Sequence, residues 1–245
     1  MANPVRIPAR RVARTPAFAA AAPPEAAART REKILKAALA LFYDRGFRGT
    51  SLGAIASDAG ISAPALYWHF ASKRELCFEA VHDELRHFAY ALSLSAHEPT
   101  PEARLRQFVR TYVILKLRQN ERLKEPGALG AYRQLREALT KKQQGALDAL
   151  QHEVYHLLRT ILDAGHTTGT FRFEDTTATT FAILTICEYV FSWVRPAGRL
   201  GAADVAAIYQ NLVLGMVGCA GRTLQSGNSA CPAPLDSPLS LMNDK

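Results

Sequence analysis

Apolar residues recur at spacings of three and four along almost the whole chain, and no stretch shows the alternation typical of a half-buried strand. Ile34 and Ala38, for example, share one face of a helix predicted over residues 30–45. Thr30 is placed to cap this helix and Gly46 to end it. The chain is therefore predicted to be all-α, with later helices over residues 72–94, from 101 onward, 129–139, 140–165, 176–194 and 202–220.

Two short helices are predicted between residues 50 and 70, on either side of the turn "DAGIS". Thr50 or Ser51 is placed to cap the first of them, and Ser62 to cap the second. Pro64 falls in the first turn of the second helix, where a missing N–H loses no helical hydrogen bond. Two helices joined by a short glycine-containing turn form a helix-turn-helix, here part of a three-helix head that precedes a larger helical body.

In this motif the second helix lies in the DNA major groove, with its N-terminal residues toward the base edges. Small residues at that end allow close approach and apolar contact with thymine methyl groups. The hydrogen-bond donors that follow suit phosphate oxygens, which position a protein without reading sequence. In the competing structural reading, Leu66, Tyr67 and Phe70 simply pack the three-helix core. The candidates for base contact are Ala63, Pro64 and Ala65, and those for phosphate contact are Tyr67, Trp68, His69 and Lys73.

The net charge of +8 is concentrated in the first third of the chain. Residues 1–74 hold 12 Lys and Arg against 4 Asp and Glu, whereas the remainder holds 18 of each. A basic module joined to a neutral body indicates a polyanion as the partner of the module alone. Five of the arginines lie within residues 1–29, so a solubilising tail would explain part of the same excess.

Both ends of the chain have the composition of disordered segments. Residues 1–29 combine arginines with many Ala and Pro, and we expect a basic arm there, with a transit peptide as the alternative. The stretch "GNSACPAPLDSP" predicts a disordered tail over residues 223–245. Four widely spaced cysteines favour free thiols in a reducing compartment, with the cytoplasm as the default. No apolar run reaches the 18 residues that a membrane span needs.

The stretch "ILKAALALFYDRGFRGTSLGAIASDAGISAPALYWHFASKRELCFEAV" resembles the N-terminal domain of the TetR family of bacterial transcriptional regulators. The resemblance covers about 50 residues and includes the Gly-Phe pair, Ala-Gly-Ile-Ser and Leu-Tyr-Trp-His-Phe. It implies a symmetric dimer that binds a palindromic operator, has no enzymatic activity or cofactor, and releases DNA when a small effector binds. The implied domains are a helix-turn-helix over residues 30–76 and an effector-binding and dimerisation domain over residues 77–222.

The resemblance also implies roles for individual residues of the head. Ala63, Pro64 and Ala65 face bases in that pattern, and Gly53 stands where relatives often have a polar residue able to reach a base. Direct readout is therefore expected to be sparse, with DNA shape or the basic arm adding selectivity. The residues at positions that usually touch backbone phosphates are Thr50, Ser62, Tyr67, His69 and Lys73.

A second resemblance covers roughly residues 100–220, where "FSWVRPAGRLGAADVAAIY" is similar to a branch that represses lipid or sterol-ring breakdown genes and responds to acyl-CoA thioesters. An acyl chain or ring needs an apolar cavity, and CoA phosphates need fixed cations beside an adenine-stacking surface. In the competing reading, Trp193 is a core residue and the arginines stabilise a helix end. The candidate effector-binding residues are Phe108, Tyr112, Phe181, Trp193, Arg195 and Arg199.

The strongly apolar helices over residues 176–194 and 202–220 are candidates for a four-helix interface between two subunits. Deep burial within one subunit would produce the same pattern.

"HEVYH", residues 152–156, fits the H-E-x-x-H pattern of zinc hydrolases, in which two histidines bind the metal and the Glu acts as general base. A catalytic zinc also needs a third protein ligand, and "LLRTILDAGH" downstream offers none at the required spacing. His152, Glu153 and His156 also fall on the polar side of a predicted amphipathic helix. We therefore expect no metal site at this motif. The alternatives are a metal in the effector site and, as an alternative function, a zinc-dependent hydrolase.

Overall fold

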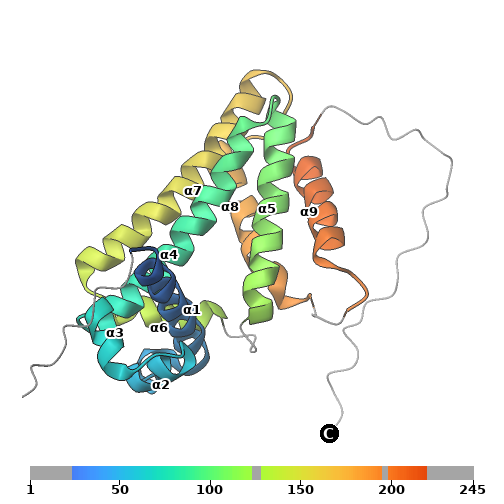
Figure 1. The fold of residues 1–245 in the computed structure, drawn as a ribbon. Coiled ribbons are helices and arrows are strands. Elements are labelled where there is room, and N and C mark those ends of the chain that lie inside the picture. The colour runs from blue at the N-terminus through green and yellow to red at the C-terminus, as the bar shows by residue number, and fades with distance from the viewer. Residues whose placement is uncertain (1–23, 123–127, 195–197, 220–245) are drawn as a thin grey trace, which may run out of the picture. The chain divides into compact units, whose positions relative to one another are not determined.

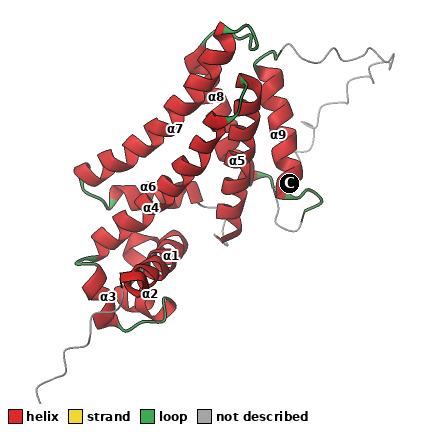
Figure 2. Cartoon of the chain, turned by 45° about the horizontal axis from the view of Figure 1, so that its top comes forward, coloured by secondary structure: helices red, strands yellow, loops and turns green. Residues whose placement is uncertain are grey.

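The computed structural model describes residues 24–122, 128–194 and 198–219, and this part of the chain folds into helices joined by short loops, with no strand (Figures 1 and 2). The predicted all-α class is confirmed. The helices in the first half are α1 (Pro24–Gly49), α2 (Leu52–Asp58), α3 (Ala63–His69), α4 (Lys73–Ser93), the 3₁₀ turn η1 (Leu94–His97) and α5 (Pro101–Arg122). Those in the second half are α6 (Ala128–Glu137), α7 (Lys141–Thr167), α8 (Thr176–Glu188), the 3₁₀ turn η2 (Tyr189–Ser192) and α9 (Ala202–Met216).

Helix α1 starts earlier than its apolar pattern indicates. It begins at Pro24, so Thr30 lies inside the helix, where its hydroxyl donates to the Ala26 carbonyl oxygen at 2.9 Å rather than capping the first turn. The prediction for the start of this helix was therefore wrong. Gly46 does interrupt the helix as predicted, because its φ of 69° lies in the left-handed region that favours glycine.

The chain divides into two compact units. Among the described residues the first comprises 24–84 and 128–145, and its core contains Ile34, Phe42, Ile55 and Leu66. Helix α6 belongs to this unit and packs against α1. The domain boundary expected between residues 76 and 77 stays a prediction. The compact unit itself extends eight residues further along α4 and also includes α6.

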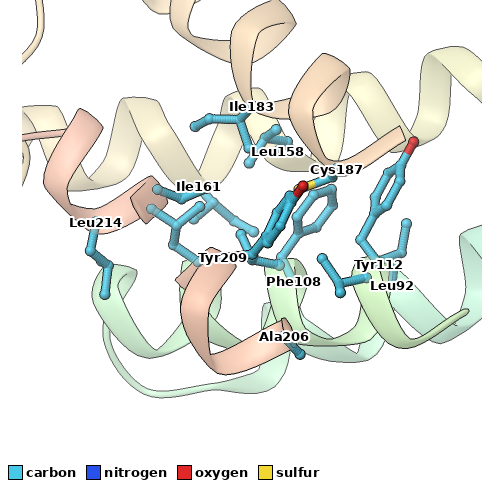
Figure 3. Packing of buried hydrophobic residues seen from close by; sticks show 14 of the residues in the cluster. Leu92, Phe108, Tyr112, Leu158, Ile161, Ile183, Cys187, Ala206, Tyr209 and Leu214 are labelled. Carbon is cyan, nitrogen blue, oxygen red and sulfur yellow. The ribbon is translucent and has the colours of Figure 1, made fainter. Parts of the chain in front are cut away.

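Among the described residues the second unit comprises 85–122, 146–194 and 198–219, and α5 lies at its centre. Helix α9 packs along α5 over the most extensive helix contact of the described chain, and α8 packs against α5 as well. Figure 3 shows Phe108, Tyr209 and Cys187 close together where these three helices meet. Helices α4 and α7 each contribute one end to each unit, because the divisions fall at Glu84 and Gly145 inside them.

None of the helices in the described ranges combines the length and the low polarity that crossing a bilayer requires.

Candidate DNA-binding and effector sites

Two serine caps fix the helix-turn-helix. The Ala54 amide donates to Ser51 Oγ at 3.1 Å at the start of α2, which identifies Ser51 rather than Thr50 as the cap. The Ala65 amide donates to Ser62 Oγ at 3.3 Å at the start of α3. Between the helices, Gly60 has a φ of 69°, and the Ile61 amide donates to the Ala56 carbonyl oxygen at 2.9 Å. The turn therefore needs a glycine, and the sequence predicted both its position and the Ser62 cap.

Helix α3 has one buried and one exposed side. Leu66 and Phe70 are buried, as the core reading predicted. Successive residues are offset by 100° around a helix, so Pro64 and Trp68 lie nearly opposite Leu66. Trp68 is 89% exposed, and Pro64, Ala63 and Tyr67 are exposed as well, whereas Ala65 is half-buried. Most of the candidate contact residues on α3 are therefore accessible to a partner.

Thr50 is buried, although it was expected to contact a backbone phosphate. Its side chain is 2% exposed, and its hydroxyl lies 2.9 Å from both the Leu41 and the Gly46 carbonyl oxygens. The hydroxyl proton is thus engaged inside the head and cannot also donate to a phosphate. We correct the expectation: the Thr50 side chain holds the Gly46 turn against α1.

Lys73 and His69 are half-buried at the edge of the head. The Lys73 ammonium lies over the Phe47 ring, 4.6 Å from its centroid, and Phe47 in turn stacks on Phe42. A cation over an aromatic face keeps a defined position without an anionic partner. The ring therefore orients Lys73 at the start of α4, one turn beyond α3.

The start of α4 carries a reciprocal cap. The Glu75 amide donates to Ser72 Oγ at 3.1 Å, and Glu75 Oε2 accepts from the Ala71 amide at 2.8 Å. Ser72 and Glu75 thus form a capping box, with its return bond made to the residue before Ser72.

In the body, the structure places Phe108 and Tyr112 in the core of the second unit, with their ring centroids 5.9 Å apart. The Tyr112 hydroxyl donates to Glu188 Oε2 at 2.6 Å, and Lys116 Nζ lies 2.8 Å from Glu188 Oε1. The edge of Phe88 meets the Tyr112 ring, and Lys116 lies over Phe88. Burial, reinforced by the Glu188 charge, raises the pKa of Tyr112 well above its ordinary value.

Sequence reasoning missed Glu188 and Lys116. The available signal was a lone acidic residue inside the strongly apolar stretch "TFAILTICEYVF", because an unpaired charge is rarely kept in such a setting.

The remaining effector candidates that the structure describes are more exposed than Phe108 and Tyr112. Phe181 is 57% exposed on α8, where its ring packs against Tyr155 of α7 at 5.2 Å. Trp193 is half exposed, and its ring stacks on Tyr209 of α9 while its Nε1 donates to the Tyr209 hydroxyl at 3.0 Å. Arg199 is exposed. Arg195 lies outside the described residues. Exposure of the Phe181 side chain does not support a place for it in a buried effector pocket.

The HEVYH stretch lies on the outer side of α7, with His152, Glu153 and His156 all exposed. The two imidazole rings are 6.5 Å apart. Within the described ranges, no group of three His, Cys, Asp or Glu side chains is arranged to hold a metal ion.

Cys77, Cys187 and Cys219 are free thiols, and the first two are buried. Cys231 lies outside the described residues.

The sequence matches two family descriptions that together cover both parts of the chain. Residues 34–80 match "Bacterial regulatory proteins, tetR family", and residues 98–217 match "Tetracyclin repressor-like, C-terminal domain". The transcriptional repressor NicS of Pseudomonas putida KT2440 is 30% identical over 164 residues, which cover 66% of this chain and 74% of NicS. The repressor KstR2 of Rhodococcus jostii RHA1 is 28% identical over 190 residues, or 75% of this chain and 89% of KstR2.

Among solved structures, AibR in complex with isovaleryl coenzyme A and operator DNA has the same fold, with a TM-score of 0.65. It is 24% identical, over 78% of this chain and 99% of AibR. Alignments with three further curated regulators span only 41%, 23% and 33% of those proteins.

Proposed function

Because the chain belongs to the TetR family of bacterial regulators, which are DNA-binding proteins and not enzymes, we propose that it is a ligand-responsive transcriptional repressor. In this proposal two subunits bind a palindromic operator, and a small hydrophobic effector releases them. The carrying observation is the exposed side of α3, which begins at a serine cap and ends in an almost fully exposed Trp68. Because members of this family are not enzymes, the alternative function as a zinc-dependent hydrolase is not proposed. The proposal includes no cofactor or metal. It keeps the cytoplasm as the predicted location of the protein.

The proposed DNA contacts follow from exposure and donor chemistry. Ala63, Pro64 and Ala65 face the base edges at the start of α3, as in a helix-turn-helix docked in the major groove. Ser62 contributes a hydroxyl whose oxygen already accepts the Ala65 amide, so its proton is available to a phosphate. The other proposed phosphate ligands are Tyr67, His69 and Lys73.

Two exposed apolar stripes support dimer formation through the last two helices. On α9, Ile208, Leu212 and Met216 follow one another at four-residue spacing and are exposed, while the opposite side of the helix is buried. On α8 and η2, Phe181 and Tyr189 are exposed at twice that spacing. Exposed stripes of this kind are typical of an interface between subunits, and we propose that a second copy covers them.

The proposed effector class is an acyl-CoA thioester. AibR was solved with isovaleryl coenzyme A, and the sequence "FSWVRPAGRLGAADVAAIY" independently suggested the same class. In the second unit, Phe108 and Tyr112 supply apolar surface, while Lys116 and Glu188 are polar groups at the edge of that core. We propose that the acyl end packs beside Tyr112 and that Arg199, together with Arg195, attracts the phosphates.

Release requires that the effector and the operator favour different arrangements of the subunit. Helix α4 is continuous from Lys73 in the head to Ser93 in the body, so its tilt carries a change in the body to α3. A dimer must place its recognition helices about 34–36 Å apart, or at a multiple of that spacing, to occupy both half-sites. A coupling of about 1–3 kcal/mol between the two ligands is then enough for partial release.

The test is a binding titration of the full chain on the DNA segment upstream of its own gene, with and without a panel of acyl-CoA thioesters. We expect tight, salt-sensitive binding that at least one thioester weakens severalfold. Binding that every thioester leaves unchanged contradicts the effector class and keeps the DNA-binding function. Absence of specific binding in moderate salt contradicts the function itself.

A further inference from the structure

The outward stripe of the recognition helix is apolar. Pro64 and Trp68 are four residues apart and therefore neighbours on the helix surface, on the side opposite the buried Leu66. Ala63 beside them is exposed and, like Pro64, lacks a polar side-chain atom, so the indole Nε1 of Trp68 is the single polar side-chain atom of these three residues. In the free subunit Trp68 leaves a large aromatic surface in water, which is unfavourable unless a partner covers it.

Residue 53, at the start of the neighbouring helix α2, adds no hydrogen-bonding side chain to this surface. Gly53 is exposed in the first turn of α2, and a Cβ built on it would meet only Ser51 Oγ, at 3.9 Å. A Cβ at this position would therefore displace no neighbour. Base pairs opposite this part of α2 receive no donor or acceptor from residue 53.

The DNA major groove offers one apolar group to such a surface, the C5-methyl of thymine. Guanine, adenine and cytosine carry no methyl group there, and an apolar side chain against their polar groups leaves those hydrogen bonds unmade. We propose that Pro64 and Trp68 read operator half-sites through thymine methyl groups, so that Trp68 is a specificity-determining residue and not one of the phosphate ligands. This inference rests on the proposed docking of α3 in the major groove.

The size of the effect follows from the area of one methyl group. Removing a single buried methyl from a protein–DNA contact weakens binding about fourfold. Since a dimer contacts two half-sites, removing the symmetry-related methyl as well weakens binding by roughly fifteenfold, provided that the two contacts are independent.

The test replaces thymines by deoxyuridine, which lacks only the methyl and keeps every hydrogen-bonding group. The full chain is first footprinted on the DNA upstream of its own gene, and each thymine in the protected half-sites is then replaced in turn. We expect about a fourfold loss of affinity at one or more positions. A T·A pair replaced there by 5-methylcytosine·G, which retains the methyl, should bind more tightly than the same pair replaced by C·G.

The Trp68→Ala variant tests whether Trp68 makes the contact with the thymine methyl group. Trp68 is exposed, so the substitution should leave the fold intact, and we expect it to lose the discrimination between thymine and deoxyuridine at the affected position. If the alanine variant binds DNA too weakly to titrate, the same comparison of thymine with deoxyuridine is made with Trp68→Phe. Tyr90→Ala is the matched control, because Tyr90 is a 65% exposed aromatic residue on α4, outside the helix-turn-helix.

Two results would overturn the inference. If deoxyuridine changes the affinity less than twofold at every position while the operator is still bound tightly, methyl readout is wrong and the proposed function stands. If Trp68→Ala still distinguishes thymine from deoxyuridine as the unmodified chain does, Trp68 is not the reading residue. Loss of all specific binding by the unmodified chain would instead remove the proposed function, and the inference with it.

Discussion

The Tyr112 hydroxyl donates a hydrogen bond of 2.6 Å to the Glu188 carboxylate, which joins α5 to the last residue of α8. The same carboxylate accepts from the Lys116 ammonium at 2.8 Å. Helix α8 changes into the 3₁₀ turn η2 directly after Glu188. The Glu188 contacts therefore fix the point at which the chain turns toward Trp193, next to the apolar core of the body.

Replacing Glu188 by alanine should lower the free energy of unfolding by about 2 kcal/mol, because Lys116 loses its anionic partner and Tyr112 loses its acceptor. Urea denaturation measures the change. Glu188→Gln keeps an acceptor for Tyr112 and should lose about half as much. A loss from Glu188→Ala below about 0.5 kcal/mol would mean that the three side chains do not act together.

This contact explains what the sequence could and could not predict. Helix periodicity, the Ser62 cap and the glycine turns depend on residues close together in the chain, and those predictions are confirmed. Glu188 and Tyr112 are 76 positions apart, so their contact depends on how α5 packs against α8. Local patterns carry no information of that kind.

Thr50 is a second residue, in the head, whose contact could not be predicted from the local sequence pattern. Its position just before α2 suggests an exposed cap or phosphate ligand, but its hydroxyl bonds to the Leu41 carbonyl oxygen in α1, nine residues earlier. The start of α1 was missed for a different reason. Residues 24–29 are rich in alanine and lack an apolar period, yet alanine has the highest helix propensity.

Gly165 allows a close approach between α7 and the segment after it. A Cβ on Gly165 would lie 1.9 Å from Cδ2 of the buried Phe171 ring. Gly165→Ala should therefore destabilise the protein by about 3 kcal/mol, as overpacking in a rigid core does. Gly145→Ala on the same helix meets nothing within 4 Å and should stabilise by up to about 1 kcal/mol. Thermal unfolding of the two variants measures the difference, and equal midpoints would contradict it.

Stability should fall at alkaline pH because two thiols are buried. Burial raises the pKa of Cys77 to about 12 and that of Cys187 to about 12. Unfolding returns both thiols to their ordinary pKa of 9.0, so the unfolded chain binds fewer protons above that pH. The stabilisation is complete below pH 9 and is lost between pH 9 and 12, by up to about 1.4 kcal/mol per pH unit for each thiol. Urea denaturation at pH 8 and pH 10 tests this, and Cys77→Ala should flatten the dependence.

The same burial should protect these thiols from modification. We expect a thiol-specific reagent at pH 8 to label Cys219, which is only partly buried, well before Cys77 and Cys187. Peptide mapping of the labelled native protein measures the order. Rapid labelling of Cys187 in the folded protein would show that the core formed by α5, α8 and α9 opens readily.

Two roles of Lys73, as a phosphate ligand and as a cation that supports the fold of the head, predict different salt dependences of DNA binding. The Lys73 ammonium is held over the Phe47 ring, and the residue is half-buried. If it neutralises one operator phosphate per subunit, Lys73→Met should lower the salt dependence of a dimer, the slope of log K against log salt, by about 2. Arg110→Met, which removes an exposed cation of α5 in the body, should leave the slope unchanged. Titrations between 50 and 300 mM salt give both slopes. Reduced affinity with an unchanged slope would instead mean that Lys73 acts through its contact with the Phe47 ring, because a purely structural loss weakens binding equally at every salt concentration.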